Sequence, residues 1–169
     1  MDARKLRVIK IQYGRVTKKA DTYLKFYMRE DDVTTWYVIM SGFSGNAGEY
    51  VDGEYLVRIE LPEDYPHKPP SFYFMTPQGL YGVETKVCVD IGEYHKDNYR
   101  AVLGVDGFCN QLISGLVAWR DMTPGIQILS TTEEQKRAFA RDSVEYNRRH
   151  NDKLTGLVYE SYVAYSSHW

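Results

Sequence analysis

The sequence YLVRIELPEDYPHKPPSFYFMTPQG, residues 55–79, holds two short runs rich in β-branched and aromatic residues. These runs, 55–61 and 72–75, have the composition of strands. Between them, Tyr65-Pro66-His67-Lys68-Pro69-Pro70 places three prolines in six residues, which excludes a regular helix or a central strand there. The stretch therefore predicts two neighbouring strands joined by a stiff surface turn.

Two further runs of the same kind come earlier, at residues 23–28 and 36–40, with turn-forming residues around them. Four strands with short links predict an antiparallel meander. Residues 3–19, before the strands, carry apolar side chains at steps of three, four and three, the spacing of one helical face. These side chains are Leu6, Ile9, Tyr13 and Val16. We expect an amphipathic helix at the N-terminus.

Residues 76–107 are rich in glycine and show little periodicity. So long a loop in a compact domain is usually either functional or disordered. A hydrophobic stripe follows the loop and predicts a buried helix. The stripe consists of Phe108, Leu112 and Leu116, with Cys109, Ile113 and Val117 beside them.

Ser130 and Thr131, with Glu133 and Glu134 three positions on, form a capping-box signature. It predicts a helix that runs to about Asn151. Helical spacing then continues through Leu154, Leu157, Val158 and Tyr162. The order of helix, four strands, long loop and helices predicts an α+β fold with the helices segregated from the sheet. We divide the chain into one core domain, residues 1–151, and a C-terminal helical extension or tail, residues 152–169.

Length and charge narrow the class of protein. A chain of 169 residues fits one domain with a sizeable core. The net charge of -2 and the pI near 6.1 argue against a nucleic-acid partner, because such proteins usually carry a basic excess. No apolar run approaches a membrane span and no signal-peptide core follows Met1, so we expect no membrane association of the chain as given.

The two cysteines, Cys88 and Cys109, are too few for a disulfide framework, so we expect free thiols in the cytosol or nucleus. Cys109 lies on the apolar stripe, where a free cysteine commonly behaves as a small core side chain. Cys88 lies in the glycine-rich loop, and a loop cysteine alone is open to packing or to chemistry.

Four motifs in this order resemble the ubiquitin-conjugating enzymes, over residues 4–151. They are the Trp36 strand ending in Ser41-Gly42, the hairpin Tyr50-Val51-Asp52-Gly53-Glu54-Tyr55, the proline turn at residues 65–70, and Val87-Cys88-Val89-Asp90-Ile91. Within the family the chain is most similar to a divergent branch anchored in the endoplasmic reticulum, which carries Thr-Pro-Asn-Gly ten residues before the cysteine. Here Thr76-Pro77-Gln78-Gly79 holds that place, and residues 94–99 resemble the same branch's Phe-His-Pro-Asp-Thr-Trp. That branch usually ends in a membrane anchor, and we expect none within residues 1–169.

The resemblance implies a UBC-like fold and a transferase. Cys88 would accept ubiquitin, or a related modifier, from an activating enzyme as a thioester and pass it to an acceptor lysine or hydroxyl, usually with a ligase. ATP would be used upstream by the activating enzyme, and neither a bound cofactor nor a metal is expected. An accessible thiolate and stabilisation of the oxyanion suffice for such transfer, because the acyl group arrives already activated.

Three further residues receive roles from the resemblance. Gln78 takes the place of the family's Asn and is expected to order the loop or to donate to the oxyanion; the alternative is an exposed turn glutamine. Asp121 lies roughly where the family places an acidic gate. His95 is a candidate base for the acceptor, because histidine is the side chain whose unperturbed pKa suits this role; a solvated loop histidine is the alternative.

Two other function classes stay open. Cys88 and His95 could serve a cysteine hydrolase, but such enzymes normally draw the histidine from a distant part of the chain. A non-catalytic, ubiquitin-binding adaptor could use the same fold, but such variants typically lack the cysteine.

Partner surfaces are also implied by the resemblance. The first helix, which meets the activating enzyme in the family, carries Arg4, Lys5, Arg7 and Lys10. A solvated helical face is the alternative interpretation of this charge. On the ligase-facing surface, His67 stands in place of the usual Phe beside Pro69, and Ala101 stands in place of a proline.

Overall fold

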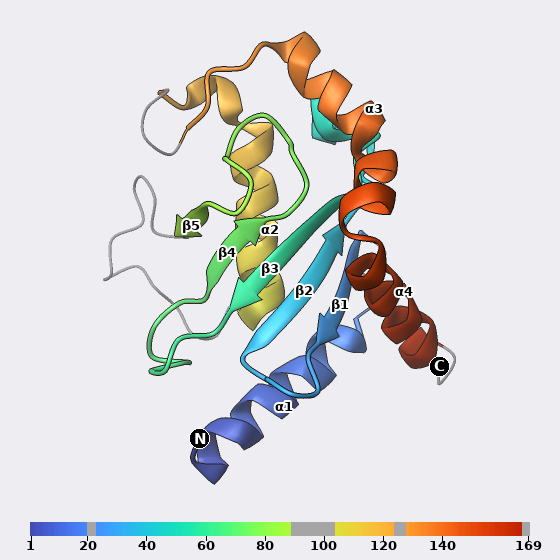
Figure 1. The fold of residues 1–169 in the computed structure, drawn as a ribbon. Coiled ribbons are helices and arrows are strands. Elements are labelled where there is room, and N and C mark those ends of the chain that lie inside the picture. Colours follow the sequence, from blue (N-terminus) through green and yellow to red (C-terminus); the bar gives the residue numbers. More distant parts are fainter. Residues whose placement is uncertain (20–22, 89–103, 124–127, 167–169) are drawn as a thin grey trace.

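An antiparallel sheet of five strands forms the centre of the fold (Figure 1). The computed structural model describes residues 1–19, 23–88, 104–123 and 128–166, and of Cys88 only the backbone. The strands are β1 (Leu24–Met28), β2 (Thr35–Met40), β3 (Tyr55–Glu60), β4 (Ser71–Phe74) and β5 (Lys86–Cys88). They follow one another in chain order across the sheet, so the predicted α+β meander is confirmed for the first four.

The fifth strand corrects the prediction that residues 76–107 are irregular throughout. β5 pairs with β4, with Ser71 opposite Cys88 and Phe72 opposite Val87. The loop is also shorter than expected, because helix α2 (Gly104–Val117) begins four residues before Phe108. A strand of three residues is too short to show a period in the sequence.

Strand β2 is buried along its whole length because both faces of the sheet are covered there. Trp36, Val38 and Met40 belong to the main core, together with side chains from α1 (Ala3–Thr17) and α2. Tyr37 and Ile39 point to the other face and pack with Val158 of α4 (Asp152–Ser166). The alternation of side chains along a strand thus builds two cores.

Helices α1 and α2 pack through the faces that the sequence predicts. In α1 the buried residues are Ile9, Tyr13 and Val16, while Leu6 is half-buried. Asp2 caps the helix by accepting a hydrogen bond from the Lys5 backbone (2.8 Å). In α2 the buried residues include Phe108, Cys109, Leu112 and Leu116. The predicted stripe is too wide, because Ile113 is only half-buried and Val117 is exposed.

Helix α3 (Glu133–His150) ends where predicted, but its capping box is shifted. The N-cap is Thr132, whose hydroxyl accepts from the Gln135 backbone, and the Gln135 side chain accepts from the Thr132 backbone. The expected caps were Ser130 and Thr131. Thr131 is not the cap because its hydroxyl donates to the Gly79 carbonyl.

The buried face of α3 is polar or small rather than hydrophobic. Its residues, at helical spacing, are Lys136, Ala140, Ser143 and Asn147. Asn147 donates to the Glu54 carbonyl and carboxylate (2.9 and 3.0 Å) and accepts from Thr76 and Asn151 (2.6 and 2.9 Å). The Asn147 side chain therefore makes all four hydrogen bonds open to it, two as a donor and two as an acceptor.

Helix α4 packs on the sheet, so residues 152–166 are helical and join the fold. Val158 is fully buried, and the Tyr159 hydroxyl donates to the Glu54 carboxylate at 2.6 Å. Figure 1 shows α4 beside β1. No helix within the described ranges is long and apolar enough to cross a bilayer.

Replacing Asn147 by Ala should lower the free energy of unfolding by about 1–3 kcal/mol, because buried groups of Thr76, Glu54 and Asn151 lose their partner. Denaturant unfolding measures this change. Asp142→Ala, at an exposed position of the same helix, is the control and should change stability by about 0.5 kcal/mol or less. Equal losses in the two variants would contradict the role given to Asn147.

Candidate active site

The segment between β4 and β5 forms a tight turn organised by Gln78. The Gln78 side chain is buried, and its carbonyl oxygen accepts from the backbones of Leu80 (2.7 Å) and Tyr81 (2.8 Å). Its amide nitrogen donates to the Tyr81 carbonyl at 2.5 Å. Gly79 follows with a φ of +88°, a conformation that favours glycine. The exposed-glutamine alternative is wrong, and these contacts are those of a residue that orders its own turn.

The C-terminal half of the chain holds this turn at both ends. Thr76 accepts from the Leu56 backbone (3.0 Å) and donates to Asn147 of α3. At the other end, Thr131 donates to the Gly79 carbonyl, and the Leu129 backbone donates to the Leu80 carbonyl (2.7 Å). Helix α3 and the segment before it therefore set the position of the turn relative to the sheet.

Cys88 is the last residue of β5, ten residues after Gln78. Val87 before it is buried in the main core, while Lys86 is exposed. The backbone at Cys88 is thus held by pairing with Ser71, although its side chain lies outside the described part of the chain. His95 and Ala101 also lie outside the described residues.

Cys109, the other cysteine, is fully buried in α2. Burial, together with the nearby Asp106 carboxylate, raises the pKa of the Cys109 thiol well above its ordinary value. A thiol that resists ionisation is a poor nucleophile. The structure agrees with its interpretation as a packed side chain.

Asp121 ends the short helix η4 (Trp119–Asp121) and is exposed to solvent. The helix is fixed through its first two residues, which bind one buried carboxylate. Glu49, in η1 (Gly45–Tyr50), accepts from the Trp119 indole (3.1 Å) and the Arg120 guanidinium (2.7 Å). Burial opposes the charge of Glu49, but the hydrogen bonds from Arg120 and Trp119 outweigh it and lower the pKa of Glu49 to about 2.

Sequence reasoning missed both Glu49 and Lys136. Glu49 lies in a glycine-rich segment without periodicity, and Lys136 looks like one more surface lysine of a charged helix. Lys136 is nevertheless only 1% exposed. Burial lowers the pKa of Lys136 from its usual value, and the Glu49 carboxylate opposes this change.

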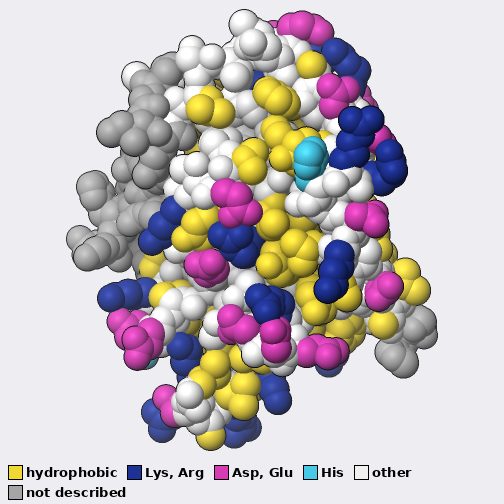
Figure 2. Space-filling model, viewed as in Figure 1, with side chains coloured by type: hydrophobic (Ala, Val, Ile, Leu, Met, Phe, Trp, Pro, Cys, Tyr) yellow, Lys and Arg dark blue, Asp and Glu magenta, His cyan; other side chains and the backbone are white. Residues whose placement is uncertain are grey.

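The proposed partner surfaces are mostly solvent-accessible. On α1, Arg4, Arg7 and Lys10 are exposed, whereas Lys5 donates to the Glu63 carbonyl (2.6 Å) and so ties the helix to the segment just before the proline turn. Figure 2 shows Lys and Arg side chains gathered over α1 at the bottom of the molecule. His67 is exposed, and Pro69 is half-buried.

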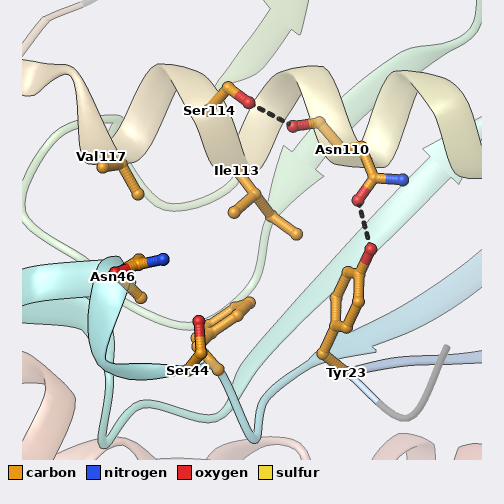
Figure 3. Close-up of a pocket in the computed structure, with 9 residues that line it drawn as sticks. Tyr23, Ser44, Asn46, Asn110, Ile113, Ser114 and Val117 are labelled. Carbon is orange, nitrogen blue, oxygen red and sulfur yellow. Dashed lines mark hydrogen bonds between the residues drawn. The ribbon is translucent and has the colours of Figure 1, made fainter.

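A groove of about 500 Å³ opens between α2 and the segment around η1 (Figure 3). Ile113 and Val117 point from α2 toward Ser44 and Asn46, and the Tyr23 hydroxyl donates to Asn110 (2.9 Å) at one end. Among the described residues, none of those to which the sequence assigns a catalytic role lines this groove. No group of three His, Cys, Asp or Glu side chains in the described ranges is arranged to hold a metal ion.

Solved structures with a similar fold include the human ubiquitin-conjugating enzyme E2 G1, with a TM-score of 0.57 and 20% identity over 69% of this chain and 97% of that one. A ubiquitin-conjugating enzyme E2 of Plasmodium falciparum gives a TM-score of 0.54 and 22% identity over 66% of this chain and 97% of the other. At this identity the likeness concerns the fold alone.

Sequence comparisons agree with the fold. Ubiquitin-conjugating enzyme E2 6 of Debaryomyces hansenii is 26% identical over 144 residues, 85% of this chain and 57% of the yeast protein. Human ubiquitin-conjugating enzyme E2 J2 is 26% identical over 139 residues, 82% of this chain and 52% of the human one. The chain thus spans about half the length of these curated relatives. A family profile described as "Ubiquitin-conjugating enzyme" matches residues 8–149, and the chain belongs to that family.

Proposed function

We propose that this chain carries ubiquitin, or a related modifier, as a thioester on Cys88 and transfers it to an acceptor amine or hydroxyl. The observation that carries the proposal is the place of Cys88. In a chain of this family it ends the edge strand β5, directly after the ordered Gln78 turn. No comparable observation favours a hydrolase or a non-catalytic adaptor.

The reaction has two acyl transfers. In the first, the Cys88 thiolate attacks the modifier's carbonyl carbon, which is bound as a thioester to the activating enzyme. A new C–S bond forms, the old one breaks, and the activating enzyme's thiolate leaves. In the second, an acceptor amine attacks the same carbon, the C–S bond to Cys88 breaks, and the amine proton passes to a base or to water. The second step is the more demanding, since a lysine with a pKa near 10.4 must lose a proton.

The residues around the thiol receive different parts in this proposal. Gln78 orders the turn that precedes β5. Asp121, as an exposed carboxylate, is available to attract or deprotonate an incoming amine. His95 keeps its proposed role as a base for the acceptor.

The partners follow from the same proposal. An activating enzyme would meet the basic outer face of α1, and a ligase would meet the surface around His67, Pro69 and Ala101. ATP is used by the activating enzyme. A chain that acts through a free thiol needs a reducing compartment, so the proposal includes the cytosol or the nucleus.

The first test is a charging assay with activating enzyme, ATP and ubiquitin or a related modifier, resolved with and without reductant. We expect an adduct that reductant removes. Cys88→Ser should abolish this reductant-sensitive adduct, while Cys109→Ala, the matched cysteine control, should retain it. A wild-type chain that forms no thioester with any modifier, or a Cys88→Ser variant that still forms one, would falsify the proposal.

Gln78→Ala should leave charging within about twofold of wild type but slow single-turnover discharge to free lysine by about tenfold or more, because small displacements cost rate steeply. Quenched time courses of the isolated thioester measure the discharge. Gln111→Ala, the same chemical change on α2, should discharge at the wild-type rate. Equal rates for the Gln78 and Gln111 variants would remove Gln78 from the mechanism.

Reversing Arg7 and Lys10 to Glu together should slow charging by about threefold to tenfold at low ionic strength, because opposite charges steer association. The difference should shrink at high salt, which screens exposed charges. Arg141 and Lys153, exposed on α3 and α4, provide a control pair for the same reversal. If charging slows equally in both double variants, or if the loss does not depend on salt, the basic face of α1 is only a solvated surface and does not bind the activating enzyme.

A further inference from the structure

Lys136 is an unusual residue because a lysine is almost never fully buried unless it is paired. Its ammonium group donates to the carbonyl oxygen (2.8 Å) and the hydroxyl (2.7 Å) of Thr131. It also lies 3.8 Å from the centre of the Trp119 ring, a cation–π distance. The buried cation is thus directed at two neighbouring segments.

The first segment is the Gln78 turn, which Lys136 reaches through one hydroxyl. Because the Thr131 hydroxyl accepts from Lys136, its single proton is free to point at the Gly79 carbonyl, to which it donates. A hydrogen bond from a charged donor is stronger than one between neutral groups. The contact is close: a Cβ atom at Gly79 would lie 2.9 Å from the Thr131 hydroxyl and 3.1 Å from Cγ of Lys136. The turn therefore rests directly on these two side chains.

The second segment is η4, which ends at Asp121. Trp119 faces Lys136 with its ring, while its indole nitrogen donates to Glu49. Arg120 binds the same carboxylate. Lys136 and Glu49 thus hold η4 from two sides, one through the ring face and the other through the ring nitrogen.

We propose that Lys136 is a positioning residue for the transfer step. Through Thr131 it fixes the turn that leads into β5 and Cys88, and through Trp119 it fixes the segment that ends at Asp121. The inference rests on the proposed function, because it concerns transfer from Cys88. It assigns to one buried lysine the relative placement of two segments far apart in the sequence.

The test uses two variants. Lys136→Met keeps the length of the side chain and removes the donor. Thr131→Val removes only the hydroxyl from the relay, the two hydrogen bonds that join Lys136 through Thr131 to Gly79. We expect both variants to charge within about twofold of wild type and to discharge to free lysine about tenfold more slowly, or worse. Val158→Ala, in the core on the opposite face of the sheet, is a destabilised control. It should lose thermal stability but discharge at the wild-type rate.

A double variant that combines Lys136→Met with Gln78→Ala distinguishes a positioning role from a general loss of stability. If both act through the same turn, the double variant should discharge about as slowly as the slower single variant. If the rate losses of the two single variants instead multiply in the double variant, the positioning role is overturned. It is also overturned if the Lys136→Met and Thr131→Val variants discharge at the rate of the Val158→Ala control. A wild-type chain that forms no thioester would instead overturn the proposed function itself. Should Lys136→Met fail to fold, Thr131→Val tests the same relay with one hydroxyl changed.

Discussion

The polar buried face of α3 is the constraint on which the rest of the site depends. A buried polar group without a partner costs free energy, so Lys136, Ser143 and Asn147 fit only if neighbouring segments present matching groups. The segments that do so contain Glu54, just before β3, Thr76, at the start of the Gln78 turn, and Thr131, just before α3. An apolar helix face would tolerate small shifts of the segments packed against it, because hydrophobic contacts are not directional. A face of directed hydrogen bonds specifies one position.

This constraint links the fold to the chemistry. The sheet fixes the backbone of Cys88 through β4, and α3 fixes the turn that leads into β5. Glu49 and Lys136 together hold η4, so the exposed carboxylate of Asp121 extends from an anchored segment. Transfer to an amine demands such placement more than charging does, because the acceptor must be positioned and deprotonated while the bond forms.

Much of the fold is visible in the sequence, but the polar contacts are not. Runs rich in β-branched and aromatic residues predicted β1 to β4, and apolar spacing predicted α1 and α2. Thr131 was expected as a cap because local patterns cannot show that its hydroxyl is used by Gly79, 52 residues away in sequence. Lys136 and Glu49 carry no local signal of burial, since a buried charge is defined by distant partners. Cys88 and Gln78 could be proposed from the sequence because their spacing and neighbours form a motif.

Amide hydrogen exchange at Leu80 and Tyr81 is the most direct test of whether the polar face of α3 holds the Gln78 turn. Both amides donate to the Gln78 side chain. We expect strong protection of these two amides in the wild-type chain and a marked loss in Lys136→Met, with unchanged protection of the amides that pair β1 with β2. Undiminished protection at Leu80 and Tyr81 in that variant would contradict this role of α3.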